Sequence, residues 1–245
     1  MGVASNNQID ITDRAKLLAW SVHLFTASGA VWGMLSILAI FEGNWPLAFV
    51  WMGAAIVVDS LDGFLARKAH VKTVLPEFDG ALLDNMVDYL NYVLVPAIFL
   101  SQSHVLPDVL PLLGPAAILL ASAYQFCQTN AKTADHFFVG FPSYWNVVVF
   151  YLLLVNINPW ISLAIILVLC ALVFVPFKYI YPTRTVRFQR LTLAVIGIWG
   201  LANLILLIQY PTVNFQLIAI SLACGVYYWG MSLFLMFDDR KRSAA

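Results

Sequence analysis

The sequence predicts an all-α fold: a polytopic membrane bundle of about eight transmembrane helices that forms a single domain over residues 1–245. Of the 245 residues, 62% are hydrophobic and only 11% are charged. An average soluble domain has about 25% charged residues, so a soluble globular protein is excluded. The few basic residues are confined to alternate connections between the predicted helices, which supports the same fold class.

A helix needs about 20 apolar residues to cross the hydrocarbon core of a bilayer. Apolar stretches of about this length predict eight spans, of which the fifth is short. They cover residues 17–41, 45–66, 80–102, 107–130, 142–156, 158–178, 189–209 and 213–236.

All 13 basic residues lie in every second connection between these spans. They occupy the N-terminal segment, residues 67–79, 131–141 and 178–190, and the C-terminal segment. The connections near residues 42, 104, 156 and 211 contain neither Lys nor Arg. Because short cytoplasmic loops carry the excess of basic residues, this alternation predicts that both termini are cytoplasmic.

Four aspartates lie at the cytoplasmic ends of the second and third predicted spans. Asp59 and Asp62 are three residues apart and Asp84 and Asp88 are four apart, so each pair shares one face of a helix. An ionised Asp inside a span costs roughly 2.5–3.5 kcal/mol on insertion scales, and bound cations are the natural compensation. Carboxylate oxygens suit Mg²⁺, Mn²⁺ or Ca²⁺, and four carboxylates are enough for two ions.

Small and basic residues beside the acids fit a phosphorylated ligand. Gly63 and Ala66 leave space against the helix, and Arg67 offers a guanidinium to a phosphate oxygen. Alternatively, Gly63, Ala66 and Gly80 are ordinary small-residue contacts between helices.

Residues 59–88 read D-x-x-D-G-x-x-A-R, then G-x-x-x-D-x-x-x-D, and this pattern resembles the signature of the CDP-alcohol phosphotransferase family. The resemblance implies an integral membrane enzyme that transfers a phosphatidyl group from CDP-diacylglycerol to an alcohol and releases CMP. By position, four residues would bind metal, two Mn²⁺ or Mg²⁺ ions: Asp59, Asp62, Asp84 and Asp88. Asp88 would also act as the general base on the acceptor hydroxyl.

The resemblance also implies a nucleotide-binding site. The residues that would contact the cytidine diphosphate are Asp62, Gly63, Ala66, Arg67 and Gly80. The chain departs from the common pattern because 12 residues, Lys68 to Asp79, separate Arg67 from Gly80, where most members have about eight.

The long spacer and the eight spans resemble the bacterial branch of the family whose acceptor is choline and whose product is phosphatidylcholine. This resemblance implies a multi-pass protein of the bacterial inner (cytoplasmic) membrane, an active site that faces the cytoplasm, and a homodimer. CDP-diacylglycerol, choline and membrane lipid are the expected partners, and no nucleic acid is expected.

A quaternary ammonium such as that of choline is held by aromatic faces. The segment of residues 137–146 is dense in aromatics, and we predict Tyr144, Trp145 and Asn146 for the choline pocket. The alternative is the aromatic belt common to membrane proteins at the interface.

Arg184, Arg187 and Arg190 are spaced three apart along one predicted helical face. Arg184 and Arg187 are predicted to bind phosphate or lipid headgroups, and positive-inside anchoring is the alternative. A phosphate-binding role would suit glycerol phosphate or inositol phosphate as the acceptor, and serine is a further alternative.

Two other classes of protein remain open. Intramembrane acids also mark the pathways of cation transporters, although those acids are expected near the bilayer midplane rather than towards one face. A catalytically silent scaffold of the same fold is the third hypothesis, and the complete set of four acids argues against it.

Overall fold

The computed structural model describes residues 13–129, 137–180 and 188–243 of the chain. These residues form helices, one of them a π-helical turn (η1), and two short strands. In chain order they are α1 (Asp13–Phe41), α2 (Trp45–Lys68), α3 (Val71–Val74), α4 (Gly80–Tyr89), η1 (Leu90–Leu94), α5 (Val95–Gln102), α6 (Leu113–Cys127), β1 (Phe137–Val139), α7 (Trp145–Val155), α8 (Pro159–Val173), β2 (Lys178–Ile180), α9 (Gln189–Gln209) and α10 (Phe215–Ser243).

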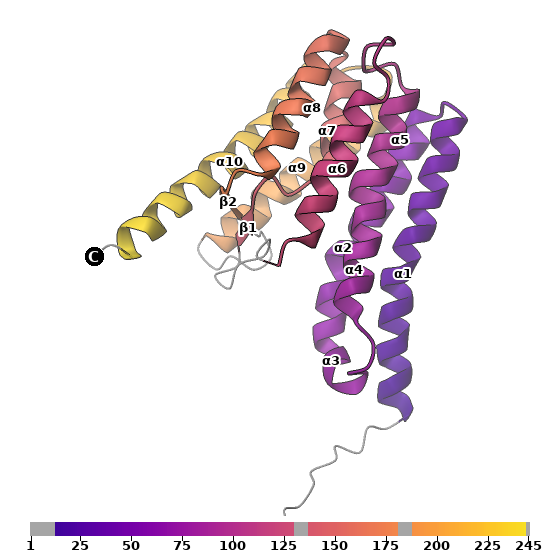
Figure 1. Cartoon of the computed structure of the whole chain (residues 1–245), viewed down its shortest axis with the longest axis vertical. Coiled ribbons are helices and arrows are strands. Elements are labelled where there is room, and N and C mark those ends of the chain that lie inside the picture. The colour runs from indigo at the N-terminus through magenta and orange to yellow at the C-terminus, as the bar shows by residue number, and fades with distance from the viewer. Residues whose placement is uncertain (1–12, 130–136, 181–187, 244–245) are drawn as a thin grey trace, which may run out of the picture.

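The helices form an up-and-down bundle, in which successive long helices run in opposite directions (Figure 1). Helices α1, α2 and the α4–α5 run lie side by side at one edge, and α6, α7 and α8 continue the bundle. Helices α9 and α10 pack against each other, and α10 extends away from the other helices towards its C-terminal end. The short helix α3 lies at the end of the bundle where α1 begins and α2 ends (Figure 1).

The prediction of a membrane helical protein is confirmed in outline. Four helical segments of the described residues are long and apolar enough to cross a membrane: α1, α2, α9 and residues 215–236 of α10. The predicted span 80–102 is one continuous helical run made of α4, η1 and α5. Three shorter apolar helices, α6, α7 and α8, occupy the positions of three further predicted spans.

The fourth predicted span begins later than the sequence indicated. Helix α6 starts at Leu113 rather than at residue 107, because Pro107 and Pro111 interrupt the helical hydrogen bonding before it. The two strands were also not predicted. β1 and β2 pair antiparallel, with Phe137 opposite Ile180, and tie the α6–α7 connection to the α8–α9 connection.

The outer surface of the bundle is apolar. Leu24 of α1 is 73% exposed, Leu120 of α6 is 74% exposed and Ile208 of α9 is 75% exposed. Many other large apolar side chains of the described residues are exposed as well, and the lipid chains of a bilayer accept such a surface.

The buried core joins α2, α5 and α7 through aromatic rings. The ring of Phe49 packs edge-to-face on Phe99, with the centroids 5.1 Å apart, and on Phe150 at 5.0 Å. Phe99 is fully buried. These contacts hold α2 against α5 and α7, which follow the acidic motif in the chain.

Helix α1 holds the α4–η1 segment through a close approach at two glycines. A Cβ on Gly29 would lie 2.5 Å from Val87 Cγ1, and one on Gly33 would collide with Leu90 and Asn91. The buried amide of Asn91 donates hydrogen bonds to the carbonyl oxygens of Gly29 (3.0 Å) and Val87 (3.1 Å). The helix that carries two of the four acids is therefore locked in place by α1.

Candidate functional site

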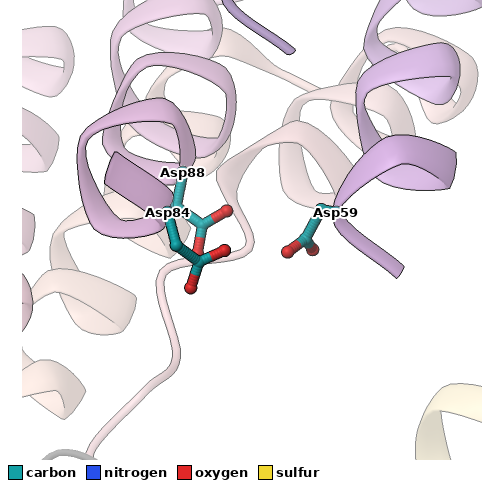
Figure 2. A group of neighbouring side chains, drawn as sticks. All are labelled: Asp59, Asp84 and Asp88. Carbon is teal, nitrogen blue, oxygen red and sulfur yellow. The ribbon is translucent and has the colours of Figure 1, made fainter. Parts of the chain in front are cut away.

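Three of the four predicted acids meet at one point of the structure. Asp59 projects from α2 towards Asp84 and Asp88 on α4 (Figure 2). Each of the three half-buried residues offers a carboxylate oxygen, and these oxygens all lie within 4.8 Å of one another. Since α2 and α4 are antiparallel neighbours, the helical spacing of the acids brings their faces together as the sequence predicted.

Asp62 lies apart from this group of three. It is buried, with 6% of its surface exposed, and it lines the same cavity as the three acids. The side chain of Thr26 in α1 lies next to its carboxyl group. Its charge is near enough to interact with those of Asp59 and Asp84. The fourth acid is therefore an inner wall of the acidic recess.

The side chain of Tyr92 completes the site. Its hydroxyl donates a hydrogen bond of 2.6 Å to Oδ2 of Asp59. Tyr92 lies four residues after Asp88, on the stripe that begins at Gly80 and runs through Asp84. Continuing that stripe by one more turn would have found this residue in the sequence.

The three carboxylates fit a divalent cation. At metal–oxygen distances of about 2.0–2.6 Å, two oxygens on opposite sides of one ion are about 4–5 Å apart. The separations of up to 4.8 Å lie in this range. The donor set consists of oxygens alone, which favours Mg²⁺, Mn²⁺ or Ca²⁺ over softer metals. Without such a charge, three neighbouring carboxylates would repel one another.

The last turns of α2 form the rim of the recess. Gly63, Ala66 and Arg67 all line the cavity that contains the acids. A Cβ on Gly63 would lie 3.3 Å from a terminal guanidinium nitrogen of Arg67, so the arginine side chain lies back over the glycine. The rim therefore presents a cation above a surface without bulk, an arrangement suited to a phosphate group.

Gly80 begins α4 and packs on an imidazole. A Cβ at this position would lie 2.7 Å from Cε1 of His23 in α1, so only glycine fits without movement. Asp79 caps the helix, because its Oδ1 accepts hydrogen bonds from the backbone N–H groups of Ala81 (3.1 Å) and Leu82 (3.0 Å). An aspartate directly before a glycine-led helix is a recognisable N-cap signal.

The long spacer between Arg67 and Gly80 packs back on the bundle. Its helix α3 buries Val71, and Leu75 follows, against Ala19 and Val22 of α1. Near the end of the spacer, the ring centroid of Phe78 lies 4.3 Å from that of His23. Residues 70–73 and 75–79 of the spacer line the cavity. The departure from the common family spacing thus adds a wall to the recess.

The predicted acceptor residues divide between two faces of α7. Tyr144 lines the cavity, and its ring packs edge-to-face on Tyr92 with centroids 6.0 Å apart. Trp145 and Asn146 are buried on the other side of the helix, and Trp145 Nε1 donates to Ser122 Oγ at 2.7 Å. Their predicted contact with choline is therefore not supported.

The helical period explains this division. The residues that line the cavity after Tyr144 are Val147, Val148 and Tyr151. They follow at intervals of three, four and seven residues, which is one face of a helix. Trp145 and Asn146, one and two positions on, must turn away from that face. Because aromatic residues are so frequent in this segment, their number did not indicate which of them share the cavity-facing side of the helix.

The last predicted residues are the three arginines at positions 184, 187 and 190. Arg184 and Arg187 lie outside the residues that the structure describes. Arg190 is exposed at the start of α9 and is not among the cavity-lining residues of the described chain.

The cavity is large and mixed in character. Its volume is about 2280 Å³, and it extends from the acidic recess to α9 and α10. Pockets for single small molecules measure about 300–1,000 Å³, so this space accommodates more than a nucleotide.

Sequence comparisons agree with this geometry. Residues 22–177 match the family described as CDP-alcohol phosphatidyltransferase. The chain is 40% identical over 225 residues to the phosphatidylcholine synthase of Pseudomonas aeruginosa, and the alignment covers 92% of this chain and 94% of that protein. It is 44% identical over 229 residues to the phosphatidylcholine synthase of Legionella pneumophila, with 89% and 87% covered. For the Agrobacterium fabrum phosphatidylcholine synthase, the identity is 37% over 224 residues, with 91% and 92% covered.

The matched residues contain the whole acidic motif, both of the helices that carry it, and Tyr92 and Tyr144. The signature in the sequence, the convergence of its acids and the extent of the match lead to one assignment. The chain belongs to the CDP-alcohol phosphatidyltransferase family.

Proposed function

We propose that this chain synthesises phosphatidylcholine by transferring the phosphatidyl group of CDP-diacylglycerol to choline, with release of CMP. The observation that carries this proposal is the convergence of Asp59, Asp84 and Asp88 within 4.8 Å, in a chain of this family. The names and the coverage of its 36–44% identical relatives support choline as the acceptor.

The donor is held at the recess by its diphosphate and its base. Arg67 binds a phosphate oxygen at the rim, and Gly63 and Ala66 let the nucleotide lie against α2. Gly80 and Asp62 complete this part of the site. The four aspartates would hold two Mn²⁺ or Mg²⁺ ions, which would supply charge stabilisation for the diphosphate and the departing CMP.

Asp88 acts as the general base. The hydroxyl of choline is neutral and must lose its proton as its oxygen attacks the phosphorus of the phosphatidyl group. Asp88 takes that proton, the new P–O bond forms, and the bond to the CMP oxygen breaks. Asp59, held by Tyr92, keeps its position during these steps.

The acceptor lies between the acids and the aromatic pair. Tyr144 offers its ring to the quaternary ammonium of choline from the cavity wall, and its partner Tyr92 lies directly beside Asp59. The ammonium is also attracted by the carboxylates of the recess. Serine brings a carboxylate beside its protonated amine and a phosphorylated alcohol brings a phosphate, so each would add a negative charge next to the acids.

The alternating basic connections support eight spans, both termini in the cytoplasm, and a recess that opens to the cytoplasmic face of the bacterial inner membrane. The resemblance to the family supports a homodimer.

The decisive experiment is CMP release by the purified protein in detergent, with CDP-diacylglycerol and Mn²⁺. Choline, serine, glycerol 3-phosphate and inositol phosphate are compared as acceptors. We expect release with choline alone and none after EDTA treatment. Release with a different acceptor would retain the family and overturn choline. Release with none of them would overturn the enzymatic proposal and return attention to cation transport.

A further inference from the structure

The cavity does not end at the acidic recess but continues along two helices that follow the residues matched to the family model. The cavity-lining residues of α9 are Thr192, Leu193, Val195, Ile196 and Trp199. Those of α10 are residue 222 and residues 224–230. The α9 positions 192, 195, 196 and 199 recur with helical spacing, so one face of the helix forms a wall. The family match ends at residue 177, before either helix.

This wall is apolar and has no charged side chain between residues 191 and 236. The acids and Arg67 line the same cavity. The cavity therefore combines charged residues suited to a diphosphate with an apolar arm formed by two helices that are long enough to span a membrane. Such a division of charge matches an amphipathic molecule rather than a nucleotide alone.

A small polar cluster interrupts the apolar arm. Trp199 Nε1 donates a hydrogen bond of 2.9 Å to the hydroxyl of Tyr151, and that hydroxyl also bonds to Ser221 Oγ. Either hydroxyl of the second pair can be the donor, so the Tyr151 O–H is able to turn towards a carbonyl group in the cavity. Both Tyr151 and Trp199 line the cavity.

The cluster lies further along α7 than Tyr144 does. Tyr151 follows Tyr144 by seven residues on the same face of α7, which places it about 10 Å further along the helix axis. Tyr144 itself contacts Tyr92, the hydrogen-bond partner of Asp59. The ester carbonyls of a glycerolipid are only a few bonds from its phosphate, while its acyl chains extend further into the membrane.

We propose that α9 and α10 form the binding site for the diacylglycerol part of the lipid substrate. The acyl chains lie along the apolar faces of these two helices, and Tyr151 donates a hydrogen bond to an ester carbonyl. This inference rests on the proposed function for the identity of the headgroup. It adds a role for the C-terminal helix pair that the family match does not cover.

The first test narrows the arm and leaves the acids unchanged. Ile196→Trp places a large ring in the cavity, and Ile198→Trp makes the same change on the outward face of α9, where the side chain is 54% exposed. CMP release is measured with choline and with CDP-dioleoylglycerol or CDP-dioctanoylglycerol as donor. We expect Ile196→Trp to raise the KM for the dioleoyl donor at least about tenfold, with the dioctanoyl donor much less affected. Ile198→Trp should stay within about twofold of the wild type, as surface changes usually do.

Equal KM values for the wild type and Ile196→Trp would overturn the inference, and so would equal effects of the two variants. If the wild type is active with choline and the KM of Ile196→Trp equals that of the wild type, the acyl-chain site is rejected while the proposed function is kept. To separate the groove from catalysis, a CDP-diacylglycerol with a diazirine at the end of an acyl chain is photolysed in the presence of the protein. Labelled peptides within α9 and α10 would support the site without any turnover, and labels confined to other helices would overturn it.

The ester contact has its own test. Tyr151→Phe should raise the KM for a diacyl donor about fivefold, the effect of one neutral hydrogen bond, and should leave the KM for the corresponding dialkyl ether donor unchanged. Tyr124→Phe is the matched control, because Tyr124 is 45% exposed and lies outside the cavity lining. An equal loss with the ester and ether donors would overturn the contact.

Discussion

The Tyr92 hydroxyl lies 2.6 Å from Oδ2 of Asp59, and this hydrogen bond connects the two helices of the acidic site. The tyrosine belongs to η1 and follows the helix that carries Asp84 and Asp88, whereas Asp59 belongs to α2. The side chain is 8% exposed, so the bond is shielded from water. Asp59 is therefore oriented by the same helical run that supplies the other two carboxylates.

Removal of this hydrogen bond should weaken the metal site without removing a ligand. Tyr92→Phe keeps the ring and its packing on Tyr144, but it leaves Asp59 without its 2.6 Å partner. Groups that orient metal ligands typically contribute 10–100-fold to affinity or activity. We expect CMP release to fall about 10–100-fold and to require more Mn²⁺ for half-saturation. Tyr89→Phe is the control on the same helical run, because its hydroxyl donates to the carbonyl of Leu119 outside the acidic group. Similar losses in the two variants would contradict the role given to Tyr92.

Neutralising the proposed base should have the largest effect on rate. Asp88→Asn preserves the size of the side chain and removes its ability to accept a proton, so we expect a loss of about 10²–10⁴-fold in kcat. Glu42→Gln, a change of the same kind at an exposed residue, should leave the rate unchanged. An unchanged rate for Asp88→Asn would eliminate this residue as the base.

Metal binding should stabilise the protein as well as activate it. The carboxylates of Asp59, Asp84 and Asp88 repel one another within 4.8 Å, and a bound cation removes this repulsion only in the folded state. We expect Mn²⁺ to raise the thermal unfolding temperature of EDTA-treated wild type. The shift should disappear in the Asp84→Asn, Asp88→Asn double variant. A double variant that is stabilised as much as the wild type would place the ion elsewhere.

The fit of α1 against the motif helix should be sensitive to one methyl group. In Gly29→Ala the new Cβ would lie 2.5 Å from Val87 Cγ1, so either the Val87 side chain or the helix that carries it must shift. We expect a loss of about 1–3 kcal/mol in stability, seen as a lower unfolding temperature, together with reduced activity. Gly53→Ala is the control, since a Cβ there meets nothing within 4 Å. If both variants unfold at the wild-type temperature, the close approach is not a constraint.

The acceptor should depend on one face of α7. Tyr144→Ala removes a ring from the cavity wall, and we expect a KM for choline that is roughly 2–30-fold higher, the range of one cation–π contact, with the KM for CDP-diacylglycerol little changed. Tyr124→Ala, at an exposed tyrosine outside the cavity lining, should change neither constant. A rise in the KM for the lipid alone would reassign Tyr144 to the donor site.

The sequence was sufficient to predict the acidic site because helical spacing is a local property. Asp84 and Asp88 share a face whatever the rest of the chain does, and antiparallel neighbours bring Asp59 to them. The outcome for Asp62 required the structure, since its depth depends on how α1 packs beside it.

The acceptor region shows where sequence patterns are insufficient. The aromatic density of residues 137–146 indicated a ring-lined pocket, but the first residue of α7 decides which rings face it. That boundary follows from the β1–β2 pairing and from Gly140, whose positive φ of 79° lets the backbone pass the end of α8. Such contacts are distant in sequence and leave no periodic signal.

The π-helical turn Leu90–Leu94 has a consequence for how this chain tolerates insertions and deletions. A π-turn accommodates one residue more than an α-turn, so the helical phase changes immediately after the acidic stripe. The acids upstream keep facing the recess, while Phe99 downstream faces the ring cluster of the core. Loss of one residue here would restore a regular helix and rotate one of these two faces by about 100°. Conservative substitutions are compatible with this turn, whereas its length is fixed by the contacts that the acids make before it and that Phe99 makes after it.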